Sequence, residues 1–325
     1  MRQELIDRLR PVTEEEKKIL SGCGSIEKEI YTTGREFTID SEKMLTKGRL
    51  IDIRTHTRFI AFPPHKHNYI EIVYMCSGQT EHMINGSTKV VLQKGDLLFM
   101  NQFSYHEVMA AAEEDIGINF IVLPEFFDAV LPMLNQENAL SSFLVSTLRK
   151  NTSTAGYLHY RVADVLPVQN LVENLVWSLL NRQANYREIN QTTMGLLFMQ
   201  LVNETDRIES GNPQQYQGIF VMQILKYIEE NYKNGSLAEV AGRMNQSVSN
   251  MSKLIKHYTG RTFKELLQEK RLAQAEYMLK GTRLPITDII YQVGYDNTSY
   301  FHRIFKEAYG MSPKSYRALE NSQVR

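Results

Sequence analysis

The stretch SLAEVAGRMNQSVSNMSKLIKHYTG, residues 236–260, decides the fold of the C-terminal third of this sequence. Its first part predicts a short helix, at whose start Ser236 and Glu239 have the spacing of a capping box. The residues NQS predict a turn, and a second amphipathic helix follows and ends at Gly260. Ala241 is small where two crossing helices approach each other closely. The pattern predicts a helix-turn-helix unit.

A second unit of the same layout follows along the chain. ITDIIYQVG, residues 286–294, predicts its first helix, and TSYFHRIFKEAYG, residues 298–310, predicts its second. The segment 263–280 between the two units predicts one long helix, which starts at a second capping box formed by Thr262 and Glu265. Two such units in one chain suit two recognition helices that enter successive major grooves of DNA.

The second helix of each unit has an apolar side and a polar side. The apolar side predicts the core of each unit, with Met251, Leu254, Ile255, Phe301, Ile304 and Phe305. The polar side carries residue types that reach base edges and phosphates. We expect the DNA-binding residues to be Ser249, Asn250, Ser252, Lys253, Lys256, Thr298, Ser299, His302, Arg303 and Lys306. A helical bundle with a solvated face is the alternative, and the repeated layout argues against it.

The charge distribution agrees with a polyanionic partner for this part of the chain. The formal net charge is zero. Residues 216–325 nevertheless contain 16 Lys and Arg against 10 Asp and Glu, an excess of 6 positive charges. The rest of the chain has the opposite excess. A basic C-terminal third on an acidic body favours DNA as the partner of that third.

The run from Ser236 to Arg317 resembles the DNA-binding domain of the AraC/XylS-type transcriptional regulators. The resemblance implies an all-α domain with two helix-turn-helix units, operator DNA as partner, a small-molecule effector and a homodimer. It favours activation and a carbohydrate-related effector, and it makes RNA polymerase a candidate partner. The residues that match are Ala241, Lys256, Gly260, Phe263, Arg271, Ala275, Leu279, Ile286, Ile289, Gly294, Tyr300, Phe301, Arg303, Phe305, Lys306, Gly310, Pro313, Tyr316 and Arg317. Met251, Ile255 and Ile290 depart mildly from the family pattern.

Residues 48–123 predict a sandwich or small barrel of short strands. The strand segments are rich in β-branched and aromatic residues: GRLIDIRT, YIEIVYM, TEHMI, TKVVL, DLLFM and INFIVL. Asn85-Gly86 stands between two of them and predicts a tight hairpin. Residues 1–47 form an N-terminal extension before this predicted domain.

The segment HKHNYIE, residues 65–71, places two histidines and a glutamate at alternating positions of an extended chain, so that His65, His67 and Glu71 share one side. Neutral imidazoles and a carboxylate are ligands for Zn, Mn, Fe or Ni. The spacing resembles the first motif of the cupin barrels that such regulators carry as sensors, and Gly95 with His106 partly fits the second. The resemblance implies one barrel mouth that contains His65, His67, Glu71 and His106.

Three interpretations of these four residues remain open. In the first, which we prefer, they form an effector pocket without metal, since a concave site with converging polar groups is the default binding site. In the second, they bind a divalent metal ion. In the third, they are strand residues whose hydrogen bonds neighbouring carbonyls satisfy. His56, His82 and His159 are expected to be structural, while His257 and His302 could face DNA or solvent equally well.

Residues 124–205 predict a helical linker and dimerisation segment. Val168, Leu171, Val172, Leu175, Val176, Leu179 and Leu180 form one apolar stripe. Burial against its own domain is the plain interpretation of the stripe, and we expect it also to form the dimer contact. Trp177 is expected in the core. Residues 206–218 are polar and predict a flexible linker, and residues 219–320 then form the DNA-binding domain.

The fold class expected from these segments is a multi-domain α+β protein: an N-terminal cupin-like β-barrel, a helical segment and a C-terminal all-α domain. No apolar run reaches the roughly 18 residues that cross a bilayer, the charged start is no secretory signal, and two cysteines give no disulfide framework. We therefore expect a cytoplasmic protein with no membrane partner, no cofactor and no enzyme activity. The expected function is that of a DNA-binding transcriptional regulator, an activator that responds to an effector in the barrel. The alternatives are a metal-dependent cupin enzyme (dioxygenase or sugar isomerase) fused to a DNA-binding domain, and a DNA-binding factor that needs no ligand.

Overall fold

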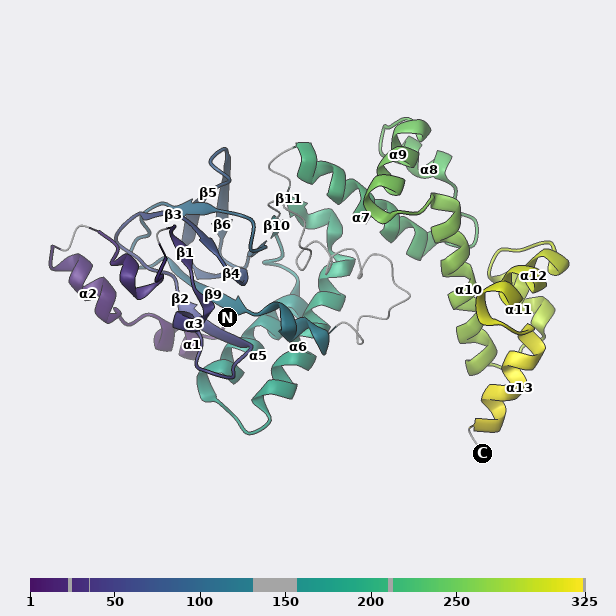
Figure 1. Ribbon diagram of the computed structural model, residues 1–325, viewed down its shortest axis with the longest axis horizontal. Helices are drawn as coiled ribbons and strands as arrows, with labels where there is room; N and C mark the ends of the chain where they lie inside the picture. The colour runs from purple at the N-terminus through teal and green to yellow at the C-terminus, as the bar shows by residue number, and fades with distance from the viewer. Residues whose placement is uncertain (23–24, 35, 131–156, 210–212, 324–325) are drawn as a thin grey trace. The chain divides into compact units, whose positions relative to one another are not determined.

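A computed structural model describes the chain except for residues 23–24, 35, 131–156, 210–212 and 324–325. The chain divides into two compact units, one up to Ile219 and one from Phe220 onward. Each unit is described by itself below (Figure 1). Within the described residues, no helix is both long enough and apolar enough to cross a membrane.

The first unit is built on two facing β-sheets, as the barrel prediction requires. The five-stranded sheet has the order β1 (Thr38–Ile39), β3 (Phe62–His67), β8 (His106–Val108), β5 (Gln79–Ile84), β6 (Thr88–Gln93). The six-stranded sheet has the order β11 (Ile208–Glu209), β10 (Tyr157–Tyr160), β7 (Leu97–Met100), β4 (Ile70–Ser77), β9 (Ile116–Val122), β2 (Ile51–Thr55). One buried cluster joins the two sheets, with Val73, Met75, Leu98, Met100 and Tyr157 on one side and Ile84, Val90 and Leu92 on the other.

The six predicted strand segments correspond to β2, β4, β5, β6, β7 and β9. In the described part of the chain, five further strands lie outside these six segments. β3 contains Pro63 and Pro64, which have no N–H to donate, and its pairing with β8 shifts register between Phe62 and His65. β10 lies in the segment expected to be helical, and β11 lies in the segment expected to be a flexible linker. Both are short and depend on pairing with distant strands, which no local pattern reveals.

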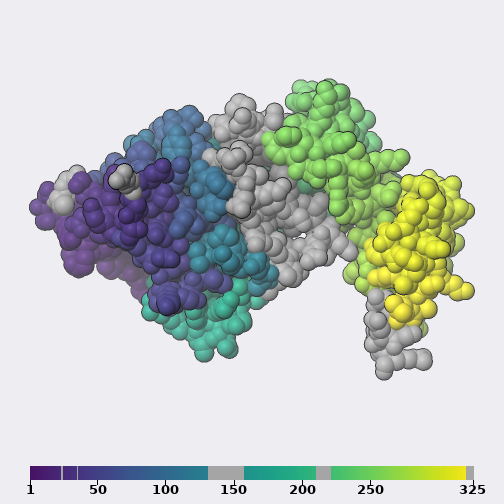
Figure 2. All heavy atoms as spheres, viewed as in Figure 1, coloured from purple at the N-terminus to yellow at the C-terminus, as the bar shows by residue number. Residues whose placement is uncertain are grey.

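The N-terminal extension folds over the barrel. It contains α1 (Gln3–Leu9), α2 (Glu14–Leu20), the 3-10 turn η1 (Lys28–Ile30) and α3 (Ser41–Met44). Ile26, Tyr31 and Ile39 pack with barrel side chains in one buried cluster. Purple atoms of this extension lie against the blue atoms of the barrel segments in the space-filling view (Figure 2). The extension therefore closes this part of the barrel.

Among the described residues, the first unit also contains two longer helices, α5 (Leu166–Asn181) and α6 (Tyr186–Asn203), and the 3-10 turns η2 (Pro124–Asp128) and η4 (Thr205–Arg207). Phe198 of α6 packs against Phe99 of β7 at 5.6 Å between ring centroids. The apolar stripe of α5 faces this core, with Val168, Val172, Leu175, Val176 and Leu179 all buried. Burial against its own domain therefore explains the stripe. The expectation for Trp177 was wrong, because its side chain is 42% exposed.

The second unit is all helical. Its described elements are the part of α7 (Pro213–Asn231) from Phe220 onward, then α8 (Leu237–Arg243), α9 (Val248–Thr259), α10 (Phe263–Gly281), α11 (Ile286–Gln292), α12 (Thr298–Tyr309) and α13 (Pro313–Gln323). The predicted capping box at Thr262 and Glu265 is complete. The one at Ser236 is half formed, because the Glu239 carboxylate instead accepts hydrogen bonds from Tyr227 and Arg243. Gly260 and Gly310 end α9 and α12 with φ of 74°, a left-handed conformation that glycine adopts without strain.

Candidate functional site

The structure brings His65, His67, Glu71 and His106 together in the barrel interior. His65 and His67 lie on β3 and His106 lies on β8, so the five-stranded sheet carries all three imidazoles. Glu71 lies on β4 and reaches them from the facing sheet. The residues therefore do not share one strand, as the alternation argument supposed. All four side chains are buried.

The polar atoms of the four residues converge on one point. Glu71 Oε2 lies 3.3 Å from His106 Nε2, and Glu71 Oε1 lies 3.5 Å from His67 Nε2. One ring nitrogen from each of His65, His67 and His106 lies within 4.8 Å of the others. We call His65, His67, Glu71 and His106 the histidine cluster.

Hydrogen bonds outside the histidine cluster fix how two of its rings are protonated. His65 Nδ1 lies 2.8 Å from the Pro63 carbonyl oxygen. A carbonyl only accepts, so Nδ1 carries the proton and Nε2 keeps a free lone pair. An outward hydrogen bond of this kind is typical of a histidine that binds a metal through its other nitrogen.

A chain of three hydrogen bonds likewise fixes the proton of the His106 ring on Nδ1. Thr80 donates its hydroxyl proton to Met75 Sδ at 3.3 Å, so its oxygen accepts from His82 Nε2 at 3.0 Å. His82 Nδ1 is then an acceptor for His106 Nδ1, 3.1 Å away. This order leaves the Nε2 lone pair of His106 directed at Glu71. His82, expected to be structural, thus orients a cluster residue.

Several buried atoms of the histidine cluster lack hydrogen bonds. His67 Nε2, Glu71 Oε2 and His106 Nε2 have no hydrogen-bond partner in the described part of the chain. Unpaired buried polar groups are uncommon and costly. Three imidazole nitrogens and one carboxylate are a suitable ligand set for a divalent transition metal. The residues therefore fit such an ion.

Burial keeps these groups uncharged when no cation is near. It lowers the pKa of His65 to about 4 and holds the pKa of His67 and His106 well below the ordinary value for histidine. Burial also raises the pKa of Glu71 to about 8. The imidazoles therefore keep the neutral form that metal coordination requires.

The space beside the histidine cluster is small. The cavity there measures about 40 Å³, and Tyr31, Ile39 and Met44 of the N-terminal extension line it together with His56 and Asn119. A single water needs roughly 10–15 Å³, whereas pockets for organic ligands measure about 300–1,000 Å³. The cavity suits an ion and a water molecule, and a sugar-sized effector would require the extension to move away.

Two more histidines differ in their surroundings. His56, also expected to be structural, lines this cavity, and its Nδ1 lies 3.4 Å from Asn119 Oδ1. His159 lies apart, between Asp96 at 3.1 Å and Glu209 at 3.3 Å, and holds β10 to its neighbours. The sequence did contain a signal for His82. Thr80, His82 and Ile84 alternate along β5 and so share one face of the strand, and Ile84 is an apolar residue expected in the core of the barrel.

The helix-turn-helix units of the second unit match the layout expected from the sequence. α8 and α9 form the first, and α11 and α12 form the second. The Ser247 hydroxyl accepts from the Asn250 N–H at the start of α9, and the Asn297 side chain accepts from the Tyr300 N–H at the start of α12. Gly294, in the turn of the second unit, has φ of 91°, and a Cβ there would lie 2.3 Å from the Lys233 carbonyl oxygen. Only glycine fits that position without displacing the backbone.

The two faces of α9 and α12 separate as predicted. Met251, Ile255, Phe301, Ile304 and Phe305 are buried, and Leu254 is half-buried. The proposed DNA-binding residues are exposed, except that Ser252 and Thr298 are half-buried. Arg303 is exposed, lies 3.5 Å from Glu307 and stacks over the Tyr300 ring at 5.3 Å. This side of α9 and α12 is therefore accessible from outside the second unit.

Comparisons with known proteins agree with both units. Residues 52–125 match a family described as an AraC-like ligand binding domain, and residues 240–319 match one described as a helix-turn-helix domain. The chain belongs to the AraC family of helix-turn-helix transcriptional regulators. It is thus a DNA-binding regulator with an AraC-like sensor domain, and the alternative of a cupin enzyme is set aside because the family is one of regulators.

Individual relatives resemble this regulator at low identity. The HTH-type transcriptional activator RhaR of Escherichia coli is 24% identical over 266 residues, which cover 81% of this chain and 89% of that protein. The RhaR of Shigella flexneri gives the same values. Among solved structures, the C-terminal domain of AraT, a response regulator from Geobacillus stearothermophilus, is 36% identical over 31% of this chain and 84% of that chain, with a TM-score of 0.30. ToxT from Vibrio cholerae is 15% identical over 82% of this chain and 97% of that chain, with a TM-score of 0.35.

Proposed function

We propose that this regulator activates transcription from operator DNA as a homodimer, and that a divalent transition-metal ion bound by the histidine cluster sets its activity. The proposal for activation follows the relatives, whose name describes a transcriptional activator. An activator acts on RNA polymerase, which is accordingly a proposed partner. The ten exposed or half-exposed polar residues of α9 and α12 are the proposed contacts with DNA.

One observation supports the metal ion above the other occupants of the barrel. The unpaired nitrogens of His67 and His106 face the Glu71 carboxylate, whose Oε2 is also unpaired. The adjacent cavity of about 40 Å³ has room for an ion but none for a sugar. His65, His67 and His106 would supply nitrogen ligands and Glu71 an oxygen ligand. Such an ion would act as a link between sheets, because Glu71 stands on the sheet that faces the histidines.

The histidine cluster adjoins the N-terminal extension, so its state can affect how the extension packs. Tyr31, Ile39 and Met44 of the N-terminal extension share the cavity with His65, Glu71 and His106. A change in the positions of these rings would therefore alter the packing of the extension on the barrel. A carbohydrate-related effector, expected from the family, needs a larger site than this one.

The dimer contact is proposed at a new surface, because the α5 stripe is buried. On α6, Ile189, Leu196 and Met199 are between 37% and 44% exposed. Their spacing of seven and three residues places them on one side of the helix. Scattered exposed apolar residues are ordinary, but a row of three on one helix side suits a second copy of the same chain.

Metal analysis of the full-length protein tests the proposal. We expect about one equivalent of a transition metal after purification, and loss of the operator response on treatment with a chelator. His67→Ala should lose the metal while its basal operator binding remains. As a matched control, His159→Gln removes another buried barrel histidine and should retain the metal. A wild-type protein that binds none of Zn²⁺, Fe²⁺, Ni²⁺ or Mn²⁺ would refute the metal-dependent part of the proposal.

A further inference from the structure

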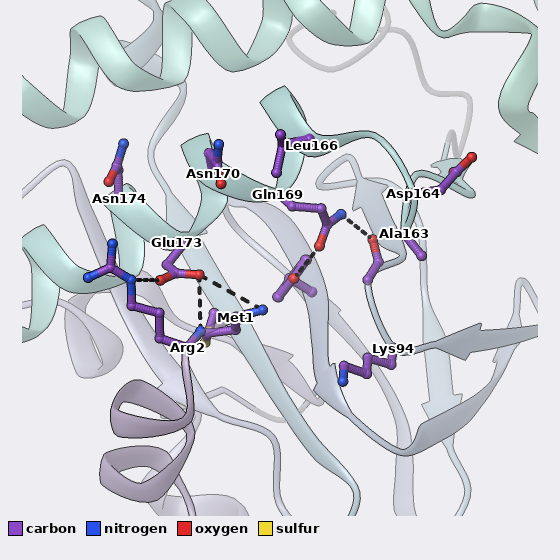
Figure 3. Close-up of a pocket in the computed structure, with 12 residues that line it drawn as sticks. Met1, Arg2, Lys94, Ala163, Asp164, Leu166, Gln169, Asn170, Glu173 and Asn174 are labelled. Carbon is purple, nitrogen blue, oxygen red and sulfur yellow. Dashed lines mark hydrogen bonds and ion pairs between the residues drawn. The ribbon is translucent and has the colours of Figure 1, made fainter.

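A second cavity lies in the first unit, away from the histidine cluster. It measures about 850 Å³ and opens between the start of α5, the Lys94–Gly95 turn and the N-terminal residues (Figure 3). Its volume falls within the range of small-molecule pockets, about 300–1,000 Å³. No residue of the histidine cluster lines it.

Part of the lining is rigid and already hydrogen-bonded. Gln169 accepts from the Tyr74 hydroxyl at 2.6 Å and donates to the carbonyl oxygens of Gly95 at 3.0 Å and Val162 at 2.9 Å. Glu173 accepts from the Arg2 backbone N–H at 3.0 Å and lies 3.1 Å from Arg2 Nε. These contacts, drawn in part in Figure 3, fix the walls and leave Gln169 and Glu173 little capacity for a ligand.

The remaining polar groups are available. Leu166, Asn170 and Asn174 are spaced four residues apart, so they lie along one face of α5, and all three are exposed. Lys94 approaches from the opposite side of the cavity (Figure 3). Within the described part of the chain, the side chains of Lys94, Asn170 and Asn174 make no hydrogen bond or ion pair with other residues. Met1 and Arg2, which also line the cavity, are paired with Glu173. Beside them the cavity offers the Lys94 ammonium, two amides and an apolar side chain.

We propose that this cavity binds a small polyhydroxylated carboxylate, a ligand of the sugar-acid class. The Lys94 ammonium would pair with the carboxylate, a charge-assisted contact that a neutral sugar cannot make. The Asn170 and Asn174 amides both donate and accept, which suits a row of hydroxyl groups. Leu166 would cover the C–H side of the ligand.

The cavity also adjoins the segment that leads to the DNA-binding unit. Asp164, which lines it, pairs with Arg207 Nη1 at 2.5 Å. The Arg161 N–H donates to the Arg207 carbonyl oxygen at 3.0 Å, and β11 follows directly. A ligand at Asp164 would disturb the ion pair that holds this segment to the sensor. This regulatory consequence rests on the proposed function, whereas the binding itself does not.

Calorimetric titration of the full-length protein tests the binding, with D-gluconate as probe and the neutral polyol sorbitol as its matched comparison. We expect one saturable gluconate site, and sorbitol binding at least about tenfold weaker, because sorbitol has no carboxylate to pair with Lys94. Lys94→Met should weaken gluconate binding by about tenfold or more. Lys47→Met, which removes an exposed lysine outside the cavity, should leave gluconate binding unchanged.

Two further variants keep the two proposals separate. The double variant Asn170→Ala, Asn174→Ala should weaken gluconate and sorbitol alike, since both present hydroxyls. His67→Ala should bind gluconate as the wild type does, which excludes chelation of a bound metal by gluconate as the source of the heat. No saturable binding of gluconate, galacturonate or glucarate would overturn the inference, as would equal affinities in the wild type and Lys94→Met. Either failure leaves the metal content and operator binding of the wild type as independent tests of the proposed function.

Discussion

His65 on β3 and His106 on β8 are direct partners across an antiparallel strand pair, and their ring centroids lie 4.3 Å apart. Two neutral imidazoles at this separation would be ordinary core neighbours if their nitrogens were satisfied. Here each ring uses Nδ1 for a hydrogen bond away from the cluster, to Pro63 and to His82. The pair is thus oriented by its surroundings, and its Nε2 atoms remain available.

Replacement of His82 tests this orientation directly. His82→Phe keeps a buried ring but removes the acceptor for His106 Nδ1, so His106 is no longer fixed with its Nε2 lone pair toward Glu71. Loss of the hydrogen-bond partner of a metal-binding histidine typically weakens metal affinity by about 10–100-fold. Competition titration with a chromophoric chelator measures the affinity, and circular dichroism checks the fold. Unchanged affinity in a folded His82→Phe protein would remove His82 from the support of the site.

Arg303 in the middle of α12 is expected to contact operator DNA. If it reads a guanine edge, Arg303→Ala should cost about 1–3 kcal/mol and relax specificity at one base pair. Arg303→Lys distinguishes the two kinds of contact, because lysine retains a phosphate contact but loses the two-pronged geometry of a base contact. Mobility-shift titrations against the operator and its single-base variants measure the affinity and the specificity at each base pair. Full affinity in Arg303→Ala would exclude this side chain from the interface.

The salt dependence of operator binding reports the phosphate contacts. Lys253, Lys256 and Lys306 are exposed on α9 and α12. Each one that neutralises a phosphate should contribute about 0.9 to the slope of log K against log salt. Its replacement by Gln should therefore lower the slope by that amount. Lys89→Gln, in the sensor barrel, is the control and should leave the slope unchanged. A slope close to zero for the wild type would argue against backbone contacts by this unit.

The buried ion pair of Glu16 with Arg58 predicts a pH-dependent stability. Arg58 Nε lies 2.8 Å from Glu16 Oε1, and both side chains are buried. Burial alone would raise the pKa of Glu16, but hydrogen bonds from Arg58 and Thr13 and the charge of Arg58 outweigh it and hold the pKa below the ordinary value. The contribution to stability is therefore complete above the unfolded pKa of about 4.3 and is lost as the pH falls through the folded pKa.

Glu16→Gln should accordingly destabilise the sensor at neutral pH by about 3–5 kcal/mol, the typical cost when one partner of a buried pair is removed. The difference in the free energy of unfolding between Glu16→Gln and the wild type should shrink as the pH falls below about 4.3. Urea unfolding at a series of pH values measures it. Glu14→Gln is the control, because that glutamate pairs with Lys17 on the surface. A difference that does not vary with pH would assign the effect to packing.

The parts of this chain that sequence could predict are those with local signals. The helix-turn-helix units could be predicted because helix caps, turn residues and apolar spacing within short segments all indicate the same helix boundaries, as at Thr262 and Gly260. The barrel strands between residues 48 and 123 were readable for the same reason. β10 and β11 were not, because four and two residues carry too little pattern and their partners are far away in the sequence. For the cluster, the composition of the site was predictable from the motif, but its arrangement across two sheets and the role of His82 required the fold.

The surface proposed for the dimer contact could not be predicted from the sequence either. The apolar stripe of α5 could be read as an internal face or a contact between copies, and periodicity cannot separate the two. Leu175 is 0% exposed and Leu196 is 44% exposed. Leu175→Glu should therefore destabilise the sensor by more than about 3 kcal/mol, because it buries a charge without a partner. Leu196→Glu should leave the fold intact and separate the proposed dimer into monomers.

Sedimentation equilibrium with thermal unfolding distinguishes these outcomes. A folded monomer for Leu196→Glu, with weaker operator binding, would support the α6 surface as the contact between copies. The exposed Leu20→Glu in the N-terminal extension is the matched control and should remain dimeric. If Leu196→Glu stays dimeric, the contact lies elsewhere, and if Leu175→Glu is a stable monomer, the stripe on α5 has to be reinstated as the dimer interface.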